Sequence, residues 1–376
     1  MGNFIRTLSE GVSLVASDDT WIEGNAIQQL QTTAKLTGML KVIGMPDLHA
    51  GRGYPIGAAF FSVGCFYPAL VGGDIGCGMS LWQTNINTVG LNLDKLEKRL
   101  GCIDAPVVSE EKQQLLNVAE SLSTNAPGTI GAGNHFAELQ QLDTIYDETK
   151  TTVLQLDKRN LQLLVHSGSR GLGGNILRIH VERFNHNGLL ENTVEATDYL
   201  AQHNYALRFA TENRELIARR ILKRLRSNGR KLVDISHNLV TPETIAGKQG
   251  WLHRKGAAPA DKGLVVIPGS RGDYSYLVQP INTEKGLLSL AHGAGRKWMR
   301  SECKGRLAKR YTAAQLTRTK LGSRVVCCNR ELLYEEAPQA YKSIDTVIEA
   351  MLGAGLIKLV ARFKPVLTYK TQKEDN

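Results

Sequence analysis

The chain has nine histidines, and six of them lie in short polar or glycine-rich runs where a side chain could do chemistry. These six are His49, His135, His166, His237, His253 and His292. Imidazole is the commonest metal ligand in proteins, and in its neutral form it is also a nucleophile. The other three, His180, His186 and His203, lack such framing, and we expect them to be structural or surface residues. The distribution favours a site that uses several histidines.

A carboxylate and a thiol are spaced to share a metal ion in the run GGDIGCG, residues 72–78. Asp74 and Cys77 lie three residues apart in one loop, and a thiolate can bridge two ions. His135, His166 and His237 each adjoin Gly, Asn or Ser and could complete the ligand shell. The alternative is a buried cysteine with hydrogen-bonded histidines, because the zinc patterns HxxxH and HExxH are absent.

Three further runs combine glycine with arginine, and the first two also contain serine: HSGSRG (166–171), PGSRGDYS (268–275) and HGAGR (292–296). Backbone amides and guanidinium groups of this kind bind phosphate oxygens. The signatures GxxxxGK[ST], GxGxxG after a strand and GxSxG are absent, which argues against a P-loop kinase or an ordinary hydrolase. A histidine among these runs could attack a phosphoryl group and pass it on, and His292 is the candidate nucleophile.

The elements that must position these motifs can be read from the segments around them. Strand-like segments precede or contain the motifs: LKVIGMP before Asp47, FYPALVGGD up to Asp74, LQLLVHSG around His166 and GLVVIPGS up to Ser270. Helical patterns are expected at 93–100, 109–122, 174–186, 195–227 and 343–361. Strands and helices do not alternate regularly, so we expect one α+β domain over residues 1–376, with a central mixed β core flanked by helices.

The composition is that of a folded protein with excess positive charge. Lys and Arg number 46 against 36 Asp and Glu, a formal charge of +10 that favours a polyanionic partner such as RNA or DNA. A basic pI is also common among soluble proteins, so the position of the charge matters more. The stretch 208–231 is expected to be a docked amphipathic helix with a basic outer face. Its apolar stripe would be Leu216, Ile217, Ile221, Leu222 and Leu225.

The cysteines and the apolar runs indicate the cellular compartment of the protein. Six cysteines show no regular framework, which favours a reducing compartment. Apolar runs of 18 residues are absent, and the N-terminal residues lack a leader pattern. We therefore expect a cytoplasmic protein without a membrane association.

In this order, the motifs resemble those of the RtcB family of RNA ligases. The matching runs are MPDLHAGRGYPIG (45–57), GGDIGCGM (72–79), GTIGAGNHFAE (128–138), HSGSRGLG (166–173), SHN (236–238), HRKGA (253–257), PGSRGDYSYLV (268–278), HGAGR (292–296) and EEAPQAYK (335–342). They span nearly the whole chain. The resemblance implies an enzyme that joins RNA ends bearing a 3′-phosphate or 2′,3′-cyclic phosphate to 5′-hydroxyl ends, using GTP and Mn²⁺.

The resemblance also implies roles for individual residues. His292 would become guanylylated, GMP would pass to the RNA 3′-phosphate, and the 5′-hydroxyl would displace it. One Mn²⁺ would be held by Asp74, Cys77 and His135, and a second by Cys77, His166 and His237. The guanosine nucleotide would contact Asn134, His135, Phe136, Ala137, Glu138, His237, Asn238, Pro268, Gly269, Ser270, Arg271, Ser275, His292, Gly293, Ala294, Gly295 and Lys370. Phosphate or RNA contacts would come from Arg170, Lys255 and Arg296.

Three features depart from the family pattern. HGAGR is followed by KWMR rather than by Met, Ser and Arg; the stretch between Cys77 and His135 is short; and TQKEDN follows Lys370, where family members typically end in Lys-Gly. Together they resemble a compact branch coupled to a release-factor-like protein, which implies repair of RNA of the translation apparatus. The alternatives are a metal-dependent phosphodiesterase that only opens 2′,3′-cyclic phosphates and a non-catalytic RNA-binding scaffold.

Overall fold

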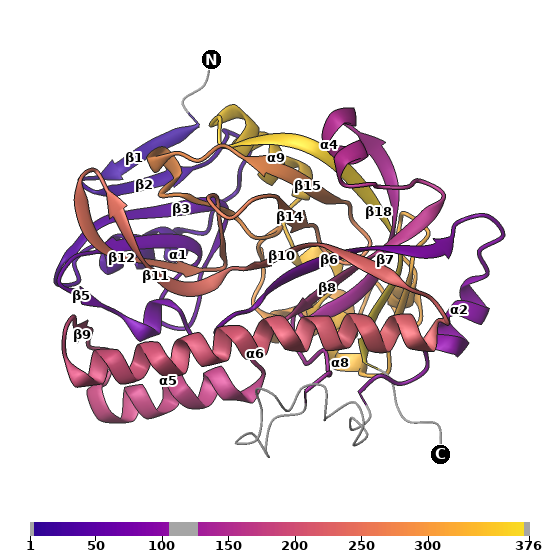
Figure 1. The fold of residues 1–376 in the computed structure, drawn as a ribbon, viewed down its shortest axis with the longest axis horizontal. Coiled ribbons are helices and arrows are strands. Elements are labelled where there is room, and N and C mark those ends of the chain that lie inside the picture. The colour runs from indigo at the N-terminus through magenta and orange to yellow at the C-terminus, as the bar shows by residue number, and fades with distance from the viewer. Residues whose placement is uncertain (1–3, 105–126, 372–376) are drawn as a thin grey trace.

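The computed structural model describes residues 4–104 and 127–371, which form sheets packed on one another with helices on their outer faces (Figure 1). The described helices are α1 (Gly24–Thr33), α2 (Leu93–Leu100), α4 (Glu148–Val153), α5 (Gly171–Phe184), α6 (Val194–Arg224), α7 (Arg300–Leu307), α8 (Arg330–Glu335) and α9 (Ile344–Gly353). Short 3-10 helices are η1 (Pro68–Leu70), η2 (Glu284–Gly286), η3 (Gln315–Thr317) and η4 (Pro338–Ala340).

Most strands belong to two large mixed sheets. Within the described ranges, the six-stranded sheet has the order β1 (Ile5–Ser9), β2 (Val12–Val15), β3 (Met39–His49), β4 (Ile56–Ser62), β12 (Lys248–Lys255), β11 (Asn238–Ile245). The eight-stranded sheet has the order β10 (Gly229–Ser236), β6 (Gly78–Asn87), β8 (Asn160–Ser167), β7 (Phe136–Ile145), β18 (Ile357–Thr371), β15 (Ser275–Pro280), β14 (Val265–Pro268), and β17 (Arg324–Cys327) pairs with β18. Two small sheets pair β13 (Ala257–Pro259) with β16 (Ser289–Ala291), and β5 (Cys65–Phe66) with β9 (Leu189–Leu190).

The largest apolar cluster lies between the two large sheets. It takes Ile43 and Phe61 from the six-stranded sheet, Leu81 and Leu164 from the eight-stranded sheet, and Val347 from α9. A second cluster fills the space between the other face of the eight-stranded sheet and helices α2 and α6. The long helix α6 crosses the molecule beneath this sheet, with α5 alongside it (Figure 1). The mixed β core flanked by helices is therefore confirmed.

The predicted helices are confirmed where an apolar face of the helix packs on the sheet. Helix α2 has the expected bounds, and α5 and α6 lie close to theirs. The basic stretch expected to be helical over 208–231 leaves the helix after Arg224, and residues 229–231 belong to strand β10. All five residues of the predicted stripe on α6 are buried, because this face packs on the eight-stranded sheet. The helix expected at 109–122 lies outside the described residues.

Two expectations of secondary structure were wrong. The helix expected over 343–361 ends at Gly353, and Ile357 and Val360 belong to strand β18. Gly355 has φ +69°, a left-handed conformation that ends a helix and is favourable for glycine. The segment before Asp74 is a 3-10 helix at Pro68–Leu70 rather than a strand, because Pro68 fixes its own φ at the start of a turn. No helix among the described residues is long and apolar enough to cross a membrane.

Candidate active site

Four neighbouring strands of the eight-stranded sheet, β10, β6, β8 and β7, have one of their two ends at the same side of the sheet. Their pairings are all antiparallel, so the starts of β6 and β7 lie beside the ends of β8 and β10. Gly78 pairs with both Ser236 and Ser167, which fixes this alignment. The predicted ligands lie at or next to these ends: Cys77, His135, His166 and His237.

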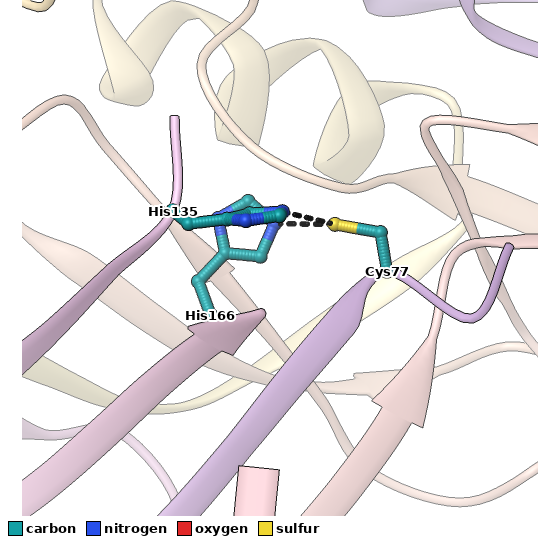
Figure 2. Close-up of side chains that lie close together, drawn as sticks. All are labelled: Cys77, His135 and His166. Carbon is teal, nitrogen blue, oxygen red and sulfur yellow. Dashed lines mark hydrogen bonds between the residues drawn. The ribbon is translucent and has the colours of Figure 1, made fainter. Parts of the chain in front are cut away.

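Three of these side chains form a compact, buried group (Figure 2). The Sγ atom of Cys77 lies 3.3 Å from His135 Nε2 and 3.1 Å from His166 Nε2. The two imidazoles point toward the sulfur from the ends of adjacent strands (Figure 2). A thiol and two imidazole nitrogens within 4.8 Å of one another can hold a metal ion.

Two more predicted ligands extend this group on opposite sides. His135 Nε2 lies 2.8 Å from Asp74 Oδ2, and His166 Nε2 lies 3.4 Å from His237 Nε2. Donor atoms that bind one ion at 2.0–2.3 Å are separated by roughly 3 to 3.7 Å. The donor atoms that converge are therefore those of Cys77, His135 and His166, with Asp74 and His237 each next to one of the two imidazoles.

Burial sets the protonation of the ligands. It lowers the pKa of His166 and His237 well below the ordinary value, so both rings are neutral and carry a free lone pair. Burial, reinforced by Asp74, raises the pKa of the Cys77 thiol well above its ordinary value. Burial would also raise the pKa of Asp74, but the adjacent His135 outweighs it and lowers that pKa. A metal that binds Cys77 must therefore displace its proton.

His292 lies beside this group, just after strand β16, and is held by a buried carboxylate. Asp47 Oδ2 accepts hydrogen bonds from His292 Nδ1 at 2.7 Å and from the His292 backbone N–H at 3.1 Å. The His292 ring centre lies 4.7 Å from that of His237. With Nδ1 bonded to the carboxylate, the lone pair of the neutral ring is on Nε2. This arrangement orients an imidazole as a nucleophile.

Asp47 was not among the predicted site residues, although it lies in one of the quoted runs. The segment around it is fixed by Lys342, whose Nζ donates to Pro46 O at 2.9 Å and Leu48 O at 2.7 Å. Gly295 packs so closely on this segment that a Cβ there would lie 2.1 Å from Asp47 O. A carboxylate that follows a strand-like run and precedes His49 was the available signal in the sequence.

Predicted nucleotide contacts from three strands meet next to the metal group. Glu138 on β7 pairs with Thr368 on β18, whose hydroxyl donates to Glu138 Oε2 at 2.5 Å. Gln140 Nε2 donates to Glu138 Oε1 at 2.7 Å and to Ser275 Oγ at 2.8 Å. Lys370 Nζ donates to Gly133 O at 2.6 Å. Burial raises the pKa of Glu138 to about 7 and lowers that of Lys370 to about 8.

Two predicted loops face each other. A Cβ on Gly293 would lie 3.3 Å from Pro268 O, so the run Gly293–Gly295 lies against Pro268–Arg271. Arg271 is buried and donates to Leu333 O, while its Nε and Nη1 have no partner within the described residues. The N–H groups of these two nitrogens are available to an anion.

The remaining predicted contacts surround the metal group. His166 Nδ1 lies 3.2 Å from Asn134 O, and the Phe136 ring packs edge-on against His166. Asn238 donates to Asp74 O and accepts from Gly256 N–H, so its side chain fixes the backbone around two motifs. The other predicted contacts lie within these same segments: Ala137, Gly269, Ser270 and Ala294.

The three predicted cationic contacts differ in their surroundings. Lys255 Nζ donates to Ala69 O at 3.2 Å and lies over Gly72, close to the metal group. Arg170 at the start of α5 packs on Gly131 in the loop before His135. Arg296 instead donates to Glu336 and to neighbouring oxygens of the protein, so its role as a phosphate contact stays a prediction.

Two buried histidines outside the metal group, His253 and His203, have structural partners. His253 Nε2 accepts from Tyr67 N–H, and His203 Nε2 accepts from Val240 N–H. Burial lowers the pKa of both rings to about 4, which keeps them neutral. The structural role expected of His203 therefore fits its surroundings, and His253 lies outside the metal group.

Comparisons with known proteins match nearly the whole chain. The family model described as "tRNA-splicing ligase RtcB" matches residues 29–120 and 97–371. The chain is 58% identical over 374 residues to RNA-splicing ligase RtcB2 of Escherichia coli strain ATCC 25922, covering 98% of each chain. It is 31% identical to tRNA-splicing ligase RtcB of Nanoarchaeum equitans, covering 96% of this chain and 95% of that one. With RNA-splicing ligase RtcB of E. coli K12 it is 29% identical, covering 93% and 95%.

Proposed function

The chain belongs to the RtcB family of tRNA-splicing ligases, and we propose that it joins RNA 3′-phosphate or 2′,3′-cyclic phosphate ends to 5′-hydroxyl ends with GTP and Mn²⁺. The observation that carries the proposal is the pairing of His292 with buried Asp47 beside a Cys and His metal group. Without the metal group, nothing would neutralise the phosphate charge as His292 attacks. A metal group that only activated water would not require the oriented imidazole of His292.

The first step would be attack by His292 Nε2 on the α-phosphorus of GTP. A phosphorus–nitrogen bond forms, the bond to the bridging oxygen breaks, and pyrophosphate leaves. The ring then carries positive charge, which the Asp47 carboxylate stabilises through Nδ1–H. The fixed ring orientation lowers the entropy lost in reaching this geometry.

The next two steps would transfer and release GMP. A 3′-phosphate oxygen of the RNA attacks the phosphorus on His292, and the phosphorus–nitrogen bond breaks. The 5′-hydroxyl oxygen then attacks the activated 3′-phosphate, GMP leaves, and the hydroxyl proton is lost. The cationic donors near this path would be Arg170, Lys255 and Arg271, whose Nε and Nη1 have no partner within the described residues.

Two metal ions would be held by the overlapping ligand sets, Asp74, Cys77 and His135 on one side and Cys77, His166 and His237 on the other. Bound metal neutralises phosphate charge and can activate water to open a cyclic phosphate. The donor set fits a divalent transition metal, because neutral imidazoles and a thiol converge within contact distance. Thiolate and imidazole prefer zinc on affinity grounds, so the choice of manganese rests on the family resemblance.

The guanine base would lie against strands β7, β15 and β18. Glu138 and Lys370 supply an acceptor and a donor from adjacent strands, and Ser275 is linked to Glu138 through Gln140. An ionised Glu138 can accept two N–H groups from one edge of guanine, which no other common base offers. The expected coupling to a release-factor-like protein and to RNA of the translation apparatus stays a prediction.

The test is covalent labelling with GTP carrying ³²P at the α-phosphate, in the presence of MnCl₂. The parent protein should acquire an acid-labile, hydroxylamine-sensitive label, and His292→Ala should acquire none. His186→Ala, which removes an exposed histidine, is the matched control and should label like the parent. Equal labelling of His292→Ala would refute the nucleophile, and opening of cyclic phosphate without any GTP label would favour the phosphodiesterase alternative.

A further inference from the structure

Helix α6 carries two buried polar side chains in the middle of its sheet-facing side. Asn213 is 1% exposed and Arg214 is 0% exposed, although the neighbouring face of the helix is apolar. A buried guanidinium is costly unless every donor is bonded, so its partners indicate why the position is charged. Neither residue belongs to the predicted site.

Arg214 binds three strand ends at the edge that carries the metal ligands. Its Nη1 donates to Gly76 O at 2.6 Å and to Ser167 O at 3.0 Å, and its Nη2 lies 3.3 Å from Ser236 Oγ. Each of these three residues is adjacent in the chain to one predicted ligand. In the same order, the ligands are Cys77, His166 and His237.

Asn213 reaches the fourth segment. Its Oδ1 accepts from Gly128 N–H at 2.7 Å, at the start of the loop that leads to His135. Its Nδ2 donates to Ser167 Oγ at 3.0 Å and to Gly168 O at 3.3 Å. One side chain therefore links the loop before β7 to the end of β8.

Asp234 balances the charge of Arg214 while the contacts of Arg214 with Gly76, Ser167 and Ser236 remain. Asp234 Oδ1 accepts from Arg214 Nε at 3.1 Å and Nη2 at 2.5 Å. Asp234 lies on β10, so the ion pair also draws that strand toward α6. A planar guanidinium can serve several acceptors in fixed directions, which a lysine ammonium cannot do.

We propose that Asn213 and Arg214 position the metal centre by holding the four ligand-bearing segments at a fixed spacing. Helix α6 acts as a brace, meaning that its residues 213 and 214 bond to groups next to the ligands in the chain, such as Gly76 O, Ser167 O and Ser236 Oγ, and leave the ligand atoms themselves free. The inference rests on the proposed metal site. It assigns both residues as positioning residues, because neither touches substrate or the reacting atoms.

The experiment measures Co²⁺ binding to the whole protein through the absorption band of a cobalt–thiolate bond. Arg214→Lys and Asn213→Ala should weaken Co²⁺ binding roughly 10- to 100-fold, the usual effect of losing a group that orients metal ligands. Arg254→Lys is the matched control: Arg254 is also 0% exposed, but it binds Ser289 Oγ and Leu288 O away from the ligands. It should lower thermal stability and leave Co²⁺ affinity unchanged.

The outcomes separate this inference from the proposed function. If Cys77→Ala keeps the parent's cobalt–thiolate absorption band, the metal site itself is wrong. If Cys77→Ala loses the band while Arg214→Lys and Asn213→Ala develop it at the same Co²⁺ concentration as the parent, the brace is wrong. A loss of affinity in Arg254→Lys equal to that in Arg214→Lys would also overturn it, because general destabilisation would then explain both. Should Arg214→Lys fail to fold, Asn213→Ala decides by the same criteria.

Discussion

Asp47 is the residue on which the candidate nucleophile depends most directly. It is fully buried, and one of its oxygens accepts both N–H groups that His292 offers on that side. Lys342 fixes the backbone on both sides of Asp47, so the carboxylate has little freedom to move. The pair therefore sets the ring orientation and the position of the lone pair.

We predict that Asp47→Asn slows guanylylation of His292 by roughly 10²- to 10⁴-fold with little change in fold. The amide keeps the shape of the carboxylate but cannot stabilise positive charge on the ring. Single-turnover labelling with GTP measures the rate. Asp143→Asn, which removes a surface ion pair with Arg362, is the control and should label at the parent rate. Equal rates for both variants would contradict the role of Asp47.

Glu138 is a second residue whose environment has a measurable consequence. Burial raises its pKa to about 7, even though Thr368 and Gln140 both donate to it. The folded state therefore holds this proton more tightly than the unfolded chain does. Ionising the buried Glu138 therefore destabilises the fold. This destabilisation is absent below the ordinary pKa of about 4.5, grows as the pH rises from there, and is complete above about 7.

We predict that Glu138→Gln increases the free energy of unfolding at pH 8 by up to about 3 kcal/mol, with little change at pH 4.5. Gln140 can reverse its amide to accept from the new side chain, since its Oε1 is buried without a partner in the described structure. Urea unfolding at the two pH values measures this. The same variant should label poorly with GTP, because an amide cannot accept two guanine N–H groups. A pH-independent effect would contradict the assignment.

At the scale of elements, the contact between helix α6 and the loop before β6 determines where Cys77 lies. Gly76 has φ +74° and lies directly against the helix. A Cβ there would lie 2.7 Å from Ala210 Cβ and 3.2 Å from Leu207 Cα. Glycine is therefore required both by the backbone conformation and by the close approach of the helix.

We predict that Gly76→Ala lowers the free energy of unfolding by about 2–4 kcal/mol, because backbone strain and overpacking add. Gly247→Ala tests the strain alone, since Gly247 has φ +75° and nothing within 4 Å of an added Cβ. It should cost only about 1–2 kcal/mol. Denaturant unfolding of both variants gives the comparison. Equal losses would mean that α6 tolerates a wider separation from this loop.

At the scale of the whole molecule, the site exists only in the assembled fold. Its groups come from β3, the loop before β6, the loop before β7, the end of β8, the end of β10 and the loop after β16. The chain as a whole carries a formal net charge of +10. Several basic residues of α6 lie on its exposed face, opposite the buried stripe: Arg208, Arg219, Lys223 and Arg224.

We predict that the affinity for a single-stranded RNA bearing a 3′-phosphate falls on the order of tenfold or more between 50 and 200 mM salt, as expected for about three phosphate contacts. Counterions released from the RNA on binding make the logarithm of the affinity fall linearly with that of the salt concentration. Fluorescence anisotropy at constant MnCl₂ measures the slope. A slope of zero would mean that phosphate charge contributes nothing to binding.

The sequence by itself determined the mixed class of the fold, the long helix α6 with its buried stripe, and the membership of the Cys77, His135 and His166 group. These are local signals: helical periodicity reports which face is buried, and histidines framed by glycine mark polar loops next to strands. The helix expected beyond Gly353 failed because apolar residues three positions apart, such as Ile357 and Val360, can also be buried in a strand, and spacing alone does not distinguish the two.

Only the tertiary structure decided which polar residues serve the site and which serve the fold. Asp47 and His292 are 245 positions apart and meet through the packing of β3 against the end of β16. Arg214 looked like one more cation on a basic helix, yet it bonds beside three predicted ligands, while Arg296 faces Glu336. The physical reason is that the residue type of a charged side chain does not indicate which group it will bind. Long-range antiparallel pairing and burial select that partner, and neither leaves a local pattern in the sequence.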